Sequence, residues 1–278
     1  MPQGISIHIG LNQVDPSHYN GWSGQLRACE ADAGDMARIA GAKGFDESTT
    51  LLTRDATADA VTRAISDAAG KLQAGDILFL TNSSHGGQVP DTNGDEPDQL
   101  DETWVLYDRQ LVDDELYDLW AKFAPGTRIL VFSDSCHSGS VNRGLFEISI
   151  PHVVEAAMVT PEPRTKDLPK DVAEQTYKQN KELYDEVQNE HPSAETAKVG
   201  ATVILISGCQ DNQLSLDGDK NGLFTQQVLA VWDDGKWVGS HPSFHKAVGA
   251  KMPPTQSPNY APVGASDGAF EQQTPLTI

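Results

Sequence analysis

The chain of 278 residues carries a net charge of −20, from 40 acidic and 20 basic side chains. Phosphate recognition needs clustered Lys and Arg, so this balance argues against nucleic acid and anionic membranes as partners. Hydrophobic residues make up 38% and charged residues 22%, which is enough to bury a core and excludes global disorder. We therefore expect a folded α/β protein.

Cysteine usage points to a reducing compartment. The three cysteines, Cys29, Cys136 and Cys209, form no CxxC pair and suggest no disulfide framework. This usage favours a cytoplasmic setting. The first ten residues have no basic region, and no apolar stretch is long enough to span a bilayer, so we expect neither a signal peptide nor a membrane helix.

Strand-like and helix-like segments alternate along the chain. The apolar patterns predict strands at 4–11, 50–53, 76–81, 103–107, 128–132, 202–206 and 259–264. They predict helices at 29–42, 57–72, 112–123, 171–189, 223–232 and 243–252, and an acidic loop at 88–102. This alternation predicts a mostly parallel sheet with helices on both faces.

Residues 141–197 interrupt the alternation. They begin with weakly patterned, Pro-containing sequence and continue as a polar helix. A crossover between parallel strands needs only a dozen or more residues, so we interpret 141–197 as an inserted, processable linker. Such loops are favoured sites of cleavage, and this one offers several basic residues, Arg143, Arg164, Lys166 and Lys170. A tolerated surface insertion is the alternative.

Two buried strand-like runs end in reactive side chains. One leads to His85-Gly86-Gly87 and the other to Cys136, at the strand ends where open α/β sheets place their chemistry. A neighbouring imidazole raises the thiolate fraction of a cysteine and later protonates the leaving amine. Main-chain N–H groups of glycines can stabilise an oxyanion. We predict Cys136 as nucleophile, His85 as general base and acid, and Gly86 as oxyanion donor.

Other interpretations of these residues stay open at this point. Cys136 could be a buried core cysteine, a common fate of this residue type. His137 competes with His85 for the role of base, although adjacent residues at a strand end tend to point apart. A zinc site built from both histidines and Cys136 lacks a fourth ligand. No Gly-x-Ser-x-Gly motif is present, which argues against an α/β-hydrolase.

The two motifs resemble those of the caspase superfamily. Ser83-Ser84-His85-Gly86 and Asp134-Ser135-Cys136-His137-Ser138-Gly139 are most similar to the prokaryotic metacaspase-like branch, often called orthocaspases. In caspases the histidine precedes the cysteine by about 50 residues, as here. The resemblance implies one caspase-like domain over 1–278, a three-layer α/β sandwich with a mostly parallel sheet of about six strands. It also implies a monomeric Cys–His dyad endopeptidase acting on proteins or peptides.

One position departs from the family pattern. Ser84 stands where the family has Gly. This departure supports an alternative from another functional class, a catalytically weak or inactive caspase-like scaffold or adaptor.

The resemblance also implies the specificity. Metacaspase-like enzymes cleave after Arg or Lys through an acidic S1 pocket, and the family pattern places Asp32, Asp134 and Ser83 in that pocket. Paired carboxylates suit a guanidinium fork. The alternative is that Asp32 faces solvent and Asp134 caps a turn. We therefore expect a basic P1 residue and self-cleavage within 141–197.

Many metacaspases need calcium, and the family ligands match Asp101, Asp113 and Asp114, whose hard oxygen atoms suit this ion. A further family carboxylate falls near Arg143, which argues against a full site, and a solvated acidic loop is the alternative. At the end of strand 202–206, Asp211 is a candidate substrate contact, whereas Cys209 is more typical of a structural cysteine.

Overall fold

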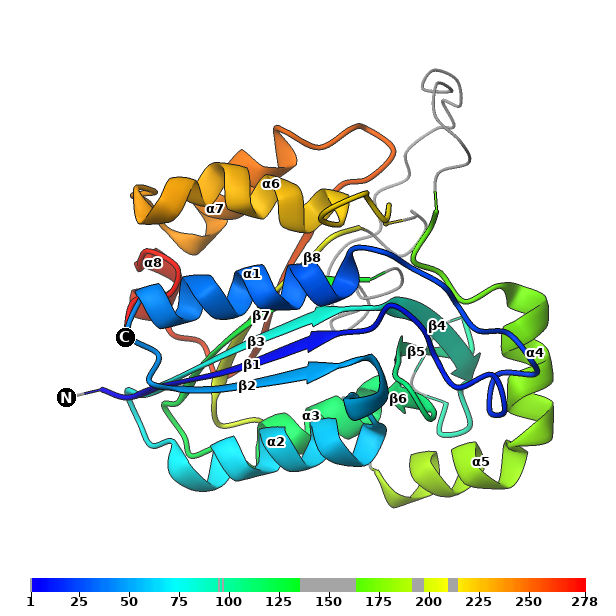
Figure 1. Ribbon diagram of the computed structural model, residues 1–278. Helices are drawn as coiled ribbons and strands as arrows, with labels where there is room; N and C mark the ends of the chain where they lie inside the picture. Colours follow the sequence, from blue (N-terminus) through cyan, green and yellow to red (C-terminus); the bar gives the residue numbers. More distant parts are fainter. Residues whose placement is uncertain (1, 95, 97, 136–163, 192–197, 210–214) are drawn as a thin grey trace.

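The computed structural model describes residues 2–94, 96, 98–135, 164–191, 198–209 and 215–278 (Figure 1). Its centre is a six-stranded sheet in the order β2-β1-β3-β7-β8-β9. The strands are β1 (Gly4–Gly10), β2 (Glu47–Leu52), β3 (Ile77–Ser83), β7 (Arg128–Asp134), β8 (Thr202–Ser207) and β9 (Asn259–Gly264). Only β9 pairs antiparallel in this sheet. The predicted mostly parallel α/β sheet of about six strands is confirmed.

Helices cover both faces of the sheet, as predicted (Figure 1). One face packs against α1 (Cys29–Ala42), α6 (Leu223–Trp232), α7 (His241–Gly249) and the short α8 (Gly268–Gln272). The opposite face packs against α2 (Ala58–Lys71) and α3 (Asp113–Ala121). Two short 3-10 turns complete these layers, η1 (Thr53–Asp55) and η2 (Asp233–Gly235).

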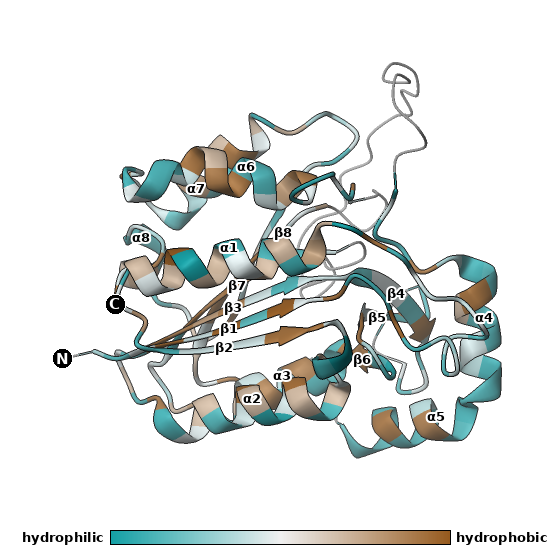
Figure 2. Cartoon of the chain, in the orientation of Figure 1, coloured by the Kyte–Doolittle hydropathy of each residue, from teal (hydrophilic) through white to brown (hydrophobic). Residues whose placement is uncertain are grey.

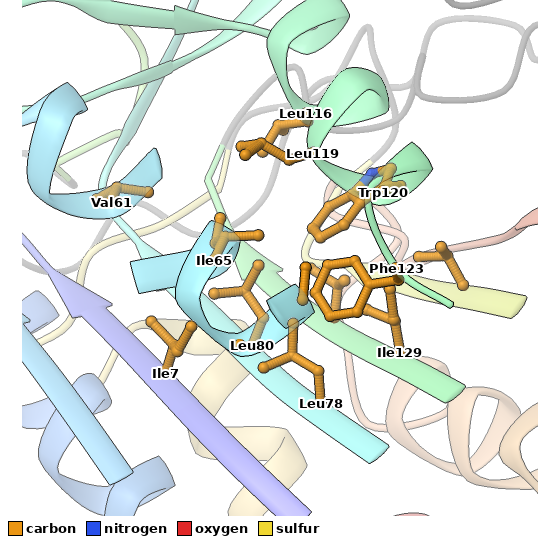
Figure 3. Packing of buried hydrophobic residues seen from close by; sticks show 14 of the residues in the cluster. Ile7, Val61, Ile65, Leu78, Leu80, Leu116, Leu119, Trp120, Phe123 and Ile129 are labelled. Carbon is orange, nitrogen blue, oxygen red and sulfur yellow. The ribbon is translucent and has the colours of Figure 1, made fainter. Parts of the chain in front are cut away.

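The apolar runs form strands because both of their faces are buried. Side chains alternate across a strand, so Leu80 and Val131 pack toward α2 and α3, whereas Phe79 and Phe132 pack toward α1 and α6. Figure 3 shows the first of these layers, in which Ile65 lies over the strands. In Figure 2 the central strands and α6 are largely brown, and α4 and α5 are mostly teal with brown patches.

A glycine lets α1 approach the carboxyl end of the sheet. Gly10 is the last residue of β1, and a Cβ atom there would overlap the carbonyl oxygen of Cys29 and lie 2.9 Å from the Cβ of Ala33. Only glycine permits this contact. The first turn of α1, which carries Asp32, is thereby held above the ends of the strands.

A second, smaller sheet corrects the expected loop at 88–102. β4 (His85–Pro90), β5 (Leu100–Val105) and β6 (Gln110–Val112) form an antiparallel sheet beyond the carboxyl end of the central sheet (Figure 1). The polar, glycine-containing sequence of β4 has little strand propensity of its own. Cross-strand pairing stabilises it, with Gly86 opposite Trp104 and Gln88 opposite Glu102.

The described part of the 141–197 linker is folded. The expected single helix 171–189 is two helices, α4 (Lys170–Gln179) and α5 (Lys181–Glu190), separated at Asn180. The Asn180 side chain donates to the carbonyl of Thr176, a local bond that competes with helix continuation. Tyr184 and Val187 of α5 pack on Val89 and Val112 of the small sheet. The helices therefore belong to the folded body.

The two chain ends lie at the amino end of the central sheet, far from the small sheet (Figure 1). Within the described ranges, no helix has the length and apolar character needed to cross a membrane.

Candidate functional site

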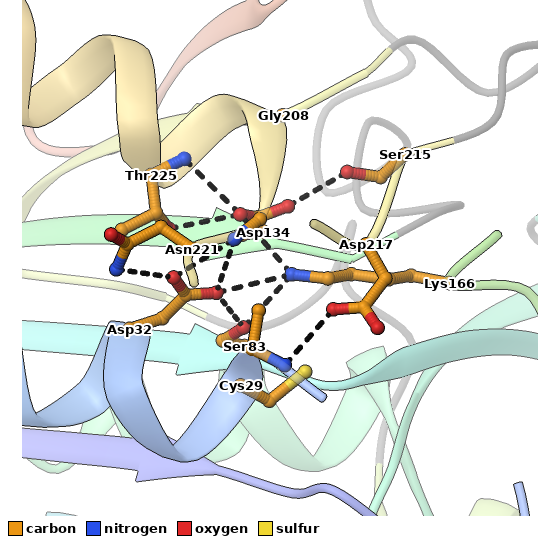
Figure 4. Close-up of polar contacts among 12 residues, drawn as sticks. Cys29, Asp32, Ser83, Asp134, Lys166, Gly208, Ser215, Asp217, Asn221 and Thr225 are labelled. Carbon is orange, nitrogen blue, oxygen red and sulfur yellow. Dashed lines mark hydrogen bonds and ion pairs between the residues drawn. The ribbon is translucent and has the colours of Figure 1, made fainter. Parts of the chain in front are cut away.

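Parallel register brings two of the predicted pocket residues together. Ser83 of β3 is paired with Asp134 of β7, so their side chains leave the same face of the sheet at adjacent strand ends. Asp32 approaches from the first turns of α1, and the Ser83 hydroxyl donates to its Oδ2 at 2.7 Å. The three residues that the family pattern assigned to S1 therefore form one cluster (Figure 4).

Both carboxylates of this cluster are buried. Asp32 is 1% and Asp134 is 2% exposed, so the alternative of a solvent-facing Asp32 is wrong. Asp134 accepts from the hydroxyls of Ser215 at 2.7 Å and Thr225 at 2.9 Å. The net pKa of Asp32 is raised to about 6: burial raises it most, the charge of Lys166 lowers it, and the neighbouring Asp134 raises it.

The amino end of α6 faces these carboxylates. The backbone N–H of Gly222, the residue before α6, donates to Asp32, and the N–H of Thr225 donates to Asp134. Helix amino termini favour negative charge. A Cβ atom at Gly222 would overlap Oδ2 of Asp134 and Nζ of Lys166, so this glycine leaves the pocket open.

The pocket holds the side chain of Lys166, a residue of the linker. Its ammonium lies 3.2 Å from Oδ2 of Asp32, 3.2 Å from Oδ2 of Asp134 and 3.0 Å from the Ser83 hydroxyl (Figure 4). Lys166 is 0% exposed. Burial lowers the pKa of this amine, but the carboxylates of Asp134 and Asp32 raise it more, so the net shift is upward and Lys166 stays charged.

The backbone around Lys166 lies between β4 and residues 215–217. The Gly86 N–H donates to the Lys166 carbonyl at 2.9 Å, and the Leu168 N–H donates to the Gly86 carbonyl at 2.8 Å. On the other side, the Lys166 N–H donates to the Ser215 carbonyl at 2.8 Å and the Asp217 N–H to the Arg164 carbonyl at 2.9 Å. Extended peptides bind to enzymes and recognition domains through such added-strand bonds.

The His85 imidazole lies beside the Lys166–Asp167 peptide. Its Nε2 donates to the Gly24 carbonyl at 2.9 Å, which assigns the hydrogen to Nε2 and leaves Nδ1 unprotonated in the neutral ring. Among the described residues, Nδ1 has no hydrogen-bond partner. Burial lowers the pKa of His85 to about 4, although the carbonyl of Gly24 and the Asp167 backbone raise it. The ring of Trp22 lies 4.7 Å away and restrains its orientation.

The predicted nucleophile Cys136 lies outside the described residues, as do His137, Arg143 and Asp211. Strand β7 ends at Asp134, two positions before Cys136 in the sequence. The cysteines that the structure describes, Cys29 and Cys209, are both buried. Burial raises the pKa of Cys29 to about 12, which makes it a poor nucleophile.

The sequence did not predict four residues that contribute to the pocket. They follow β8 and extend into the first turn of α6: Ser215, Asn221, Gly222 and Thr225. A signal was present, because residues 217–222 are an Asp/Gly/Asn-rich loop directly before an apolar helix. Such a loop can place backbone N–H groups toward a ligand. The polarity of the loop alone did not reveal which ligand these N–H groups face.

An acidic cluster lies on the small sheet. Ligand atoms of Glu96, Glu102 and Asp113 come within 4.8 Å of one another, whereas the family pattern assigned Asp101, Asp113 and Asp114. Burial raises the pKa of Asp113 well above its ordinary value, and the charges of Glu102 and Asp101 raise it further. Glu102 and Asp113 are buried and Glu96 is half-buried, and mutually repelling carboxylates that offer only oxygen ligands fit calcium. The family pattern did not include the two glutamates.

Comparisons with known proteins identify the family of this chain. The caspase-domain family model matches residues 14–274. Metacaspase-1 of Mycosarcoma maydis is 30% identical over 249 residues, covering 79% of this chain and 59% of that protein. Metacaspase-1 of Schizosaccharomyces pombe is 34% identical over 197 residues, covering 62% and 44%. The chain thus spans about half the length of these curated relatives.

Two solved structures resemble this chain. Protein GSU0716 from Geobacter sulfurreducens is 50% identical, with a TM-score of 0.86 over 99% of both chains. Caspase-1 from Spodoptera frugiperda is 9% identical with a TM-score of 0.55, covering 95% of this chain and 86% of that one, a likeness of fold alone. Because the family model covers most of its length, the chain belongs to the caspase-domain family of peptidases, family C14.

Proposed function

We propose that this protein is a cysteine endopeptidase that cleaves after Lys or Arg and that cuts its own chain between Lys166 and Asp167. One observation carries the proposal. The Lys166 ammonium lies between Asp32 and Asp134 while its carbonyl accepts from the Gly86 N–H. A substrate with a basic P1 residue needs both contacts at once.

The chemistry follows from these positions. The Cys136 thiolate attacks the carbonyl carbon of Lys166, and the developing oxyanion accepts from the Gly86 N–H. A donor of this kind is worth about 10²–10³ in rate. His85, with its hydrogen on Nε2 and Nδ1 open, takes the thiol proton and passes it to the amine of Asp167 as the peptide bond breaks. Water then hydrolyses the thioester and restores Cys136.

The same contacts keep the uncut enzyme inactive toward other proteins. Lys166 fills the pocket, and the 164–168 segment occupies the backbone contacts of the groove. A competing substrate must displace both. Self-cleavage removes the covalent tether between Lys166 and α4, after which the new chain ends at Lys166 and Asp167 can leave the groove while both fragments stay in the folded body.

The scaffold alternative receives no support from Ser84. Its hydroxyl accepts from Asn82 at 3.0 Å and donates to the His85 carbonyl at 2.9 Å, fully buried. The serine is therefore accommodated beside His85 by two local hydrogen bonds. The described geometry of His85 favours an active enzyme.

Fluorogenic peptides with Arg, Lys or Asp at P1 test the specificity. We expect turnover of the Arg and Lys peptides and none of the Asp peptide. The Asp134→Ala variant should lose this activity while its thermal unfolding stays cooperative. Turnover of the Asp peptide alone would contradict the proposal.

Intact-mass analysis of the purified chain tests self-cleavage. We expect two fragments, one ending at Lys166 and one beginning at Asp167, and neither in the Cys136→Ala variant. Lys166→Ala should abolish this cut, and the matched Lys166→Arg variant should retain it. A cut at Arg164 or Lys170 in the wild-type chain would refute Lys166 as the site.

We further propose that the acidic cluster binds calcium through Glu102 and Asp113, with Glu96 and Asp101 nearby. Calcium would supply positive charge where burial and repulsion now oppose ionisation of Asp113. Glu102 belongs to β5 and Asp113 to α3. Because β5 pairs directly with β4, which carries His85 and Gly86, the proposed ion would lie on the same small sheet as these residues.

A further inference from the structure

We propose that the groove has a subsite for an aliphatic side chain two residues after the scissile bond, and that Leu168 occupies this subsite. The inference rests on the proposed function, because it takes Lys166–Asp167 as the bond that is cut. It adds a second specificity determinant on the leaving-group side, so that the preferred sequence is Lys/Arg-x-Leu rather than any basic residue.

The backbone of Leu168 is held as that of a substrate would be. The Leu168 N–H donates to the Gly86 carbonyl at 2.8 Å. Gly86 thus makes both backbone contacts, because its own N–H donates to the Lys166 carbonyl. Asp167 is paired in parallel with Gly86. In an extended segment, alternate residues share a face. Lys166 and Leu168 therefore both point into the protein, and both are buried.

Rigid apolar walls surround the Leu168 side chain. It is 5% exposed and packs with Val14, Tyr19 and Val105, each at most 2% exposed. Val14 and Tyr19 belong to the loop after β1, and Val105 ends β5. The Tyr19 hydroxyl donates to the Leu106 carbonyl at 2.7 Å, which fixes one wall. None of these three residues belongs to the linker.

A glycine contributes the space beneath Leu168. A Cβ atom at Gly87 would lie 3.2 Å from Cδ2 of Leu168 and 3.0 Å from the Thr103 hydroxyl. Trp22 lies at the edge of the same cluster and also contacts the His85 ring. Because the three walls offer no charge, a charged side chain would lose its hydration without gaining a partner. The subsite therefore selects aliphatic side chains by size and polarity.

Two variants of the full chain test the subsite in self-cleavage. Leu168→Asp should slow the appearance of the Asp167 fragment by about tenfold or more. Leu168→Met, similar in volume and apolar, should cleave within a few-fold of wild type. The time course is followed by intact mass. Equal rates for the Asp and Met variants would overturn the inference.

A second measurement separates a subsite from a merely structural leucine. Leu168→Asp weakens the enzyme's own segment as a competitor, so it should lower the KM for a quenched Arg-Thr-Lys-Asp-Leu-Pro peptide while it slows self-cleavage. If Leu168 were only structural, Leu168→Asp would slow both self-cleavage and turnover of the peptide. That result would overturn the inference. Thermal unfolding of the Cys136→Ala chain, with and without Leu168→Asp, measures whether the substitution destabilises the fold.

Peptides with Leu, Met or Asn at the second position after Lys complete the test on unchanged enzyme. We expect kcat/KM to fall at least about tenfold from Leu to Asn and to change little from Leu to Met. Equal cleavage of all three overturns the subsite and leaves the proposed function intact. An enzyme that cleaves none of them, nor any other peptide with a basic P1, overturns the proposed function, and the inference falls with it.

Discussion

Asp32 and Asp134 are stable as a buried pair because every oxygen that faces the pocket meets a donor. Lys166 neutralises part of their charge, and Asn221 donates to Asp32 at 3.0 Å. Removing one partner of a buried ionic cluster leaves an uncompensated charge. The pocket therefore couples specificity to the stability of the uncut chain.

Lys166→Met should lower the free energy of unfolding of the uncleavable Cys136→Ala chain by about 3–5 kcal/mol. The physical reason is that Asp32 and Asp134 then stay buried together with no cation between them. The double change with Asp32→Asn should recover part of this loss, because only one buried carboxylate is left, and the Ser215 and Thr225 hydroxyls still donate to it. Urea denaturation measures both. An equal loss in the single and double variants would show that Lys166 acts through other contacts.

The rate of self-cleavage should fall as the pH drops below about 6. The pKa of Asp32 is raised to about 6, so below this value the carboxyl gains a proton, and the Lys166 ammonium loses one of the two carboxylate charges that hold it in the pocket. The pKa of His85 is lowered to about 4, so the imidazole stays neutral over this range. A pH–rate profile should show the acid limb near pH 6 in wild type.

The matched variant for this profile is Asp32→Asn. It should be slower at all pH values, and its acid limb should move toward pH 4, where His85 titrates. An acid limb that stays near pH 6 in this variant would assign the limb to another group.

At the scale of elements, α4 and α5 anchor the segment that follows the proposed scissile bond. The Tyr184 hydroxyl of α5 bonds to Nε2 of His18 at 2.8 Å and accepts from the Gln110 N–H at 3.2 Å. Tyr184 itself is fully buried against the small sheet. Because α4 follows Leu168 after a single proline, this anchor also restrains the groove segment.

Tyr184→Ala should release α5 and cost about 3 kcal/mol or more, the usual penalty for removing a large buried side chain. Hydrogen exchange should then accelerate across 170–190. The control is Leu183→Ala on the same helix, whose side chain is 38% exposed and whose effect should stay within about 0.5 kcal/mol. Unchanged exchange in Tyr184→Ala would show that α4 alone holds the segment.

The small sheet is the element that the sequence pattern concealed. The segment of β4, His-Gly-Gly-Gln-Val-Pro, did not suggest a strand because it has a single β-branched residue beside two glycines and a proline. Its partners supply the missing stabilisation, since β5 follows with Trp104 and Val105. Conversely, α1, α6 and β9 match their predicted bounds, because their apolar periodicity is set within each segment.

Across the whole molecule, both halves of a cut chain share one sheet. A cut after Lys166 places β7 in the first fragment and β8 in the second, yet these strands are paired side by side in the centre. Their side chains contribute to the same two apolar clusters. Cleavage therefore alters access to the groove and leaves the core in place.

The two fragments should co-elute in gel filtration after complete self-cleavage and separate only in denaturant. The physical reason is the shared core, since separation would expose both faces of β7 and β8 to water. Elution of two separate native species would contradict this. The uncleavable Cys136→Ala chain provides the reference elution volume.

Calcium at saturating concentration should raise the thermal unfolding temperature by roughly 5–10 °C relative to chelator-treated protein. The proposed ion would bind the folded acidic cluster and relieve repulsion around Asp113. The Asp113→Asn variant should unfold at a higher temperature than wild type without calcium and should show no calcium response. A full response in this variant would exclude the cluster as the site. Differential scanning calorimetry measures all four states.

The sequence by itself determined the fold class, the strand and helix periodicities and the reactive motif around His85 and Cys136, because these depend on local patterns and on a specific motif. The tertiary structure decided what no local pattern contains. Strand register and the approach of α1 at Gly10 bring Asp32, Ser83 and Asp134 together. Long-range packing then places Lys166 between the carboxylates. Its contact with Asp32 joins residues 134 positions apart in the sequence, and burial and charge make it favourable only in the folded chain.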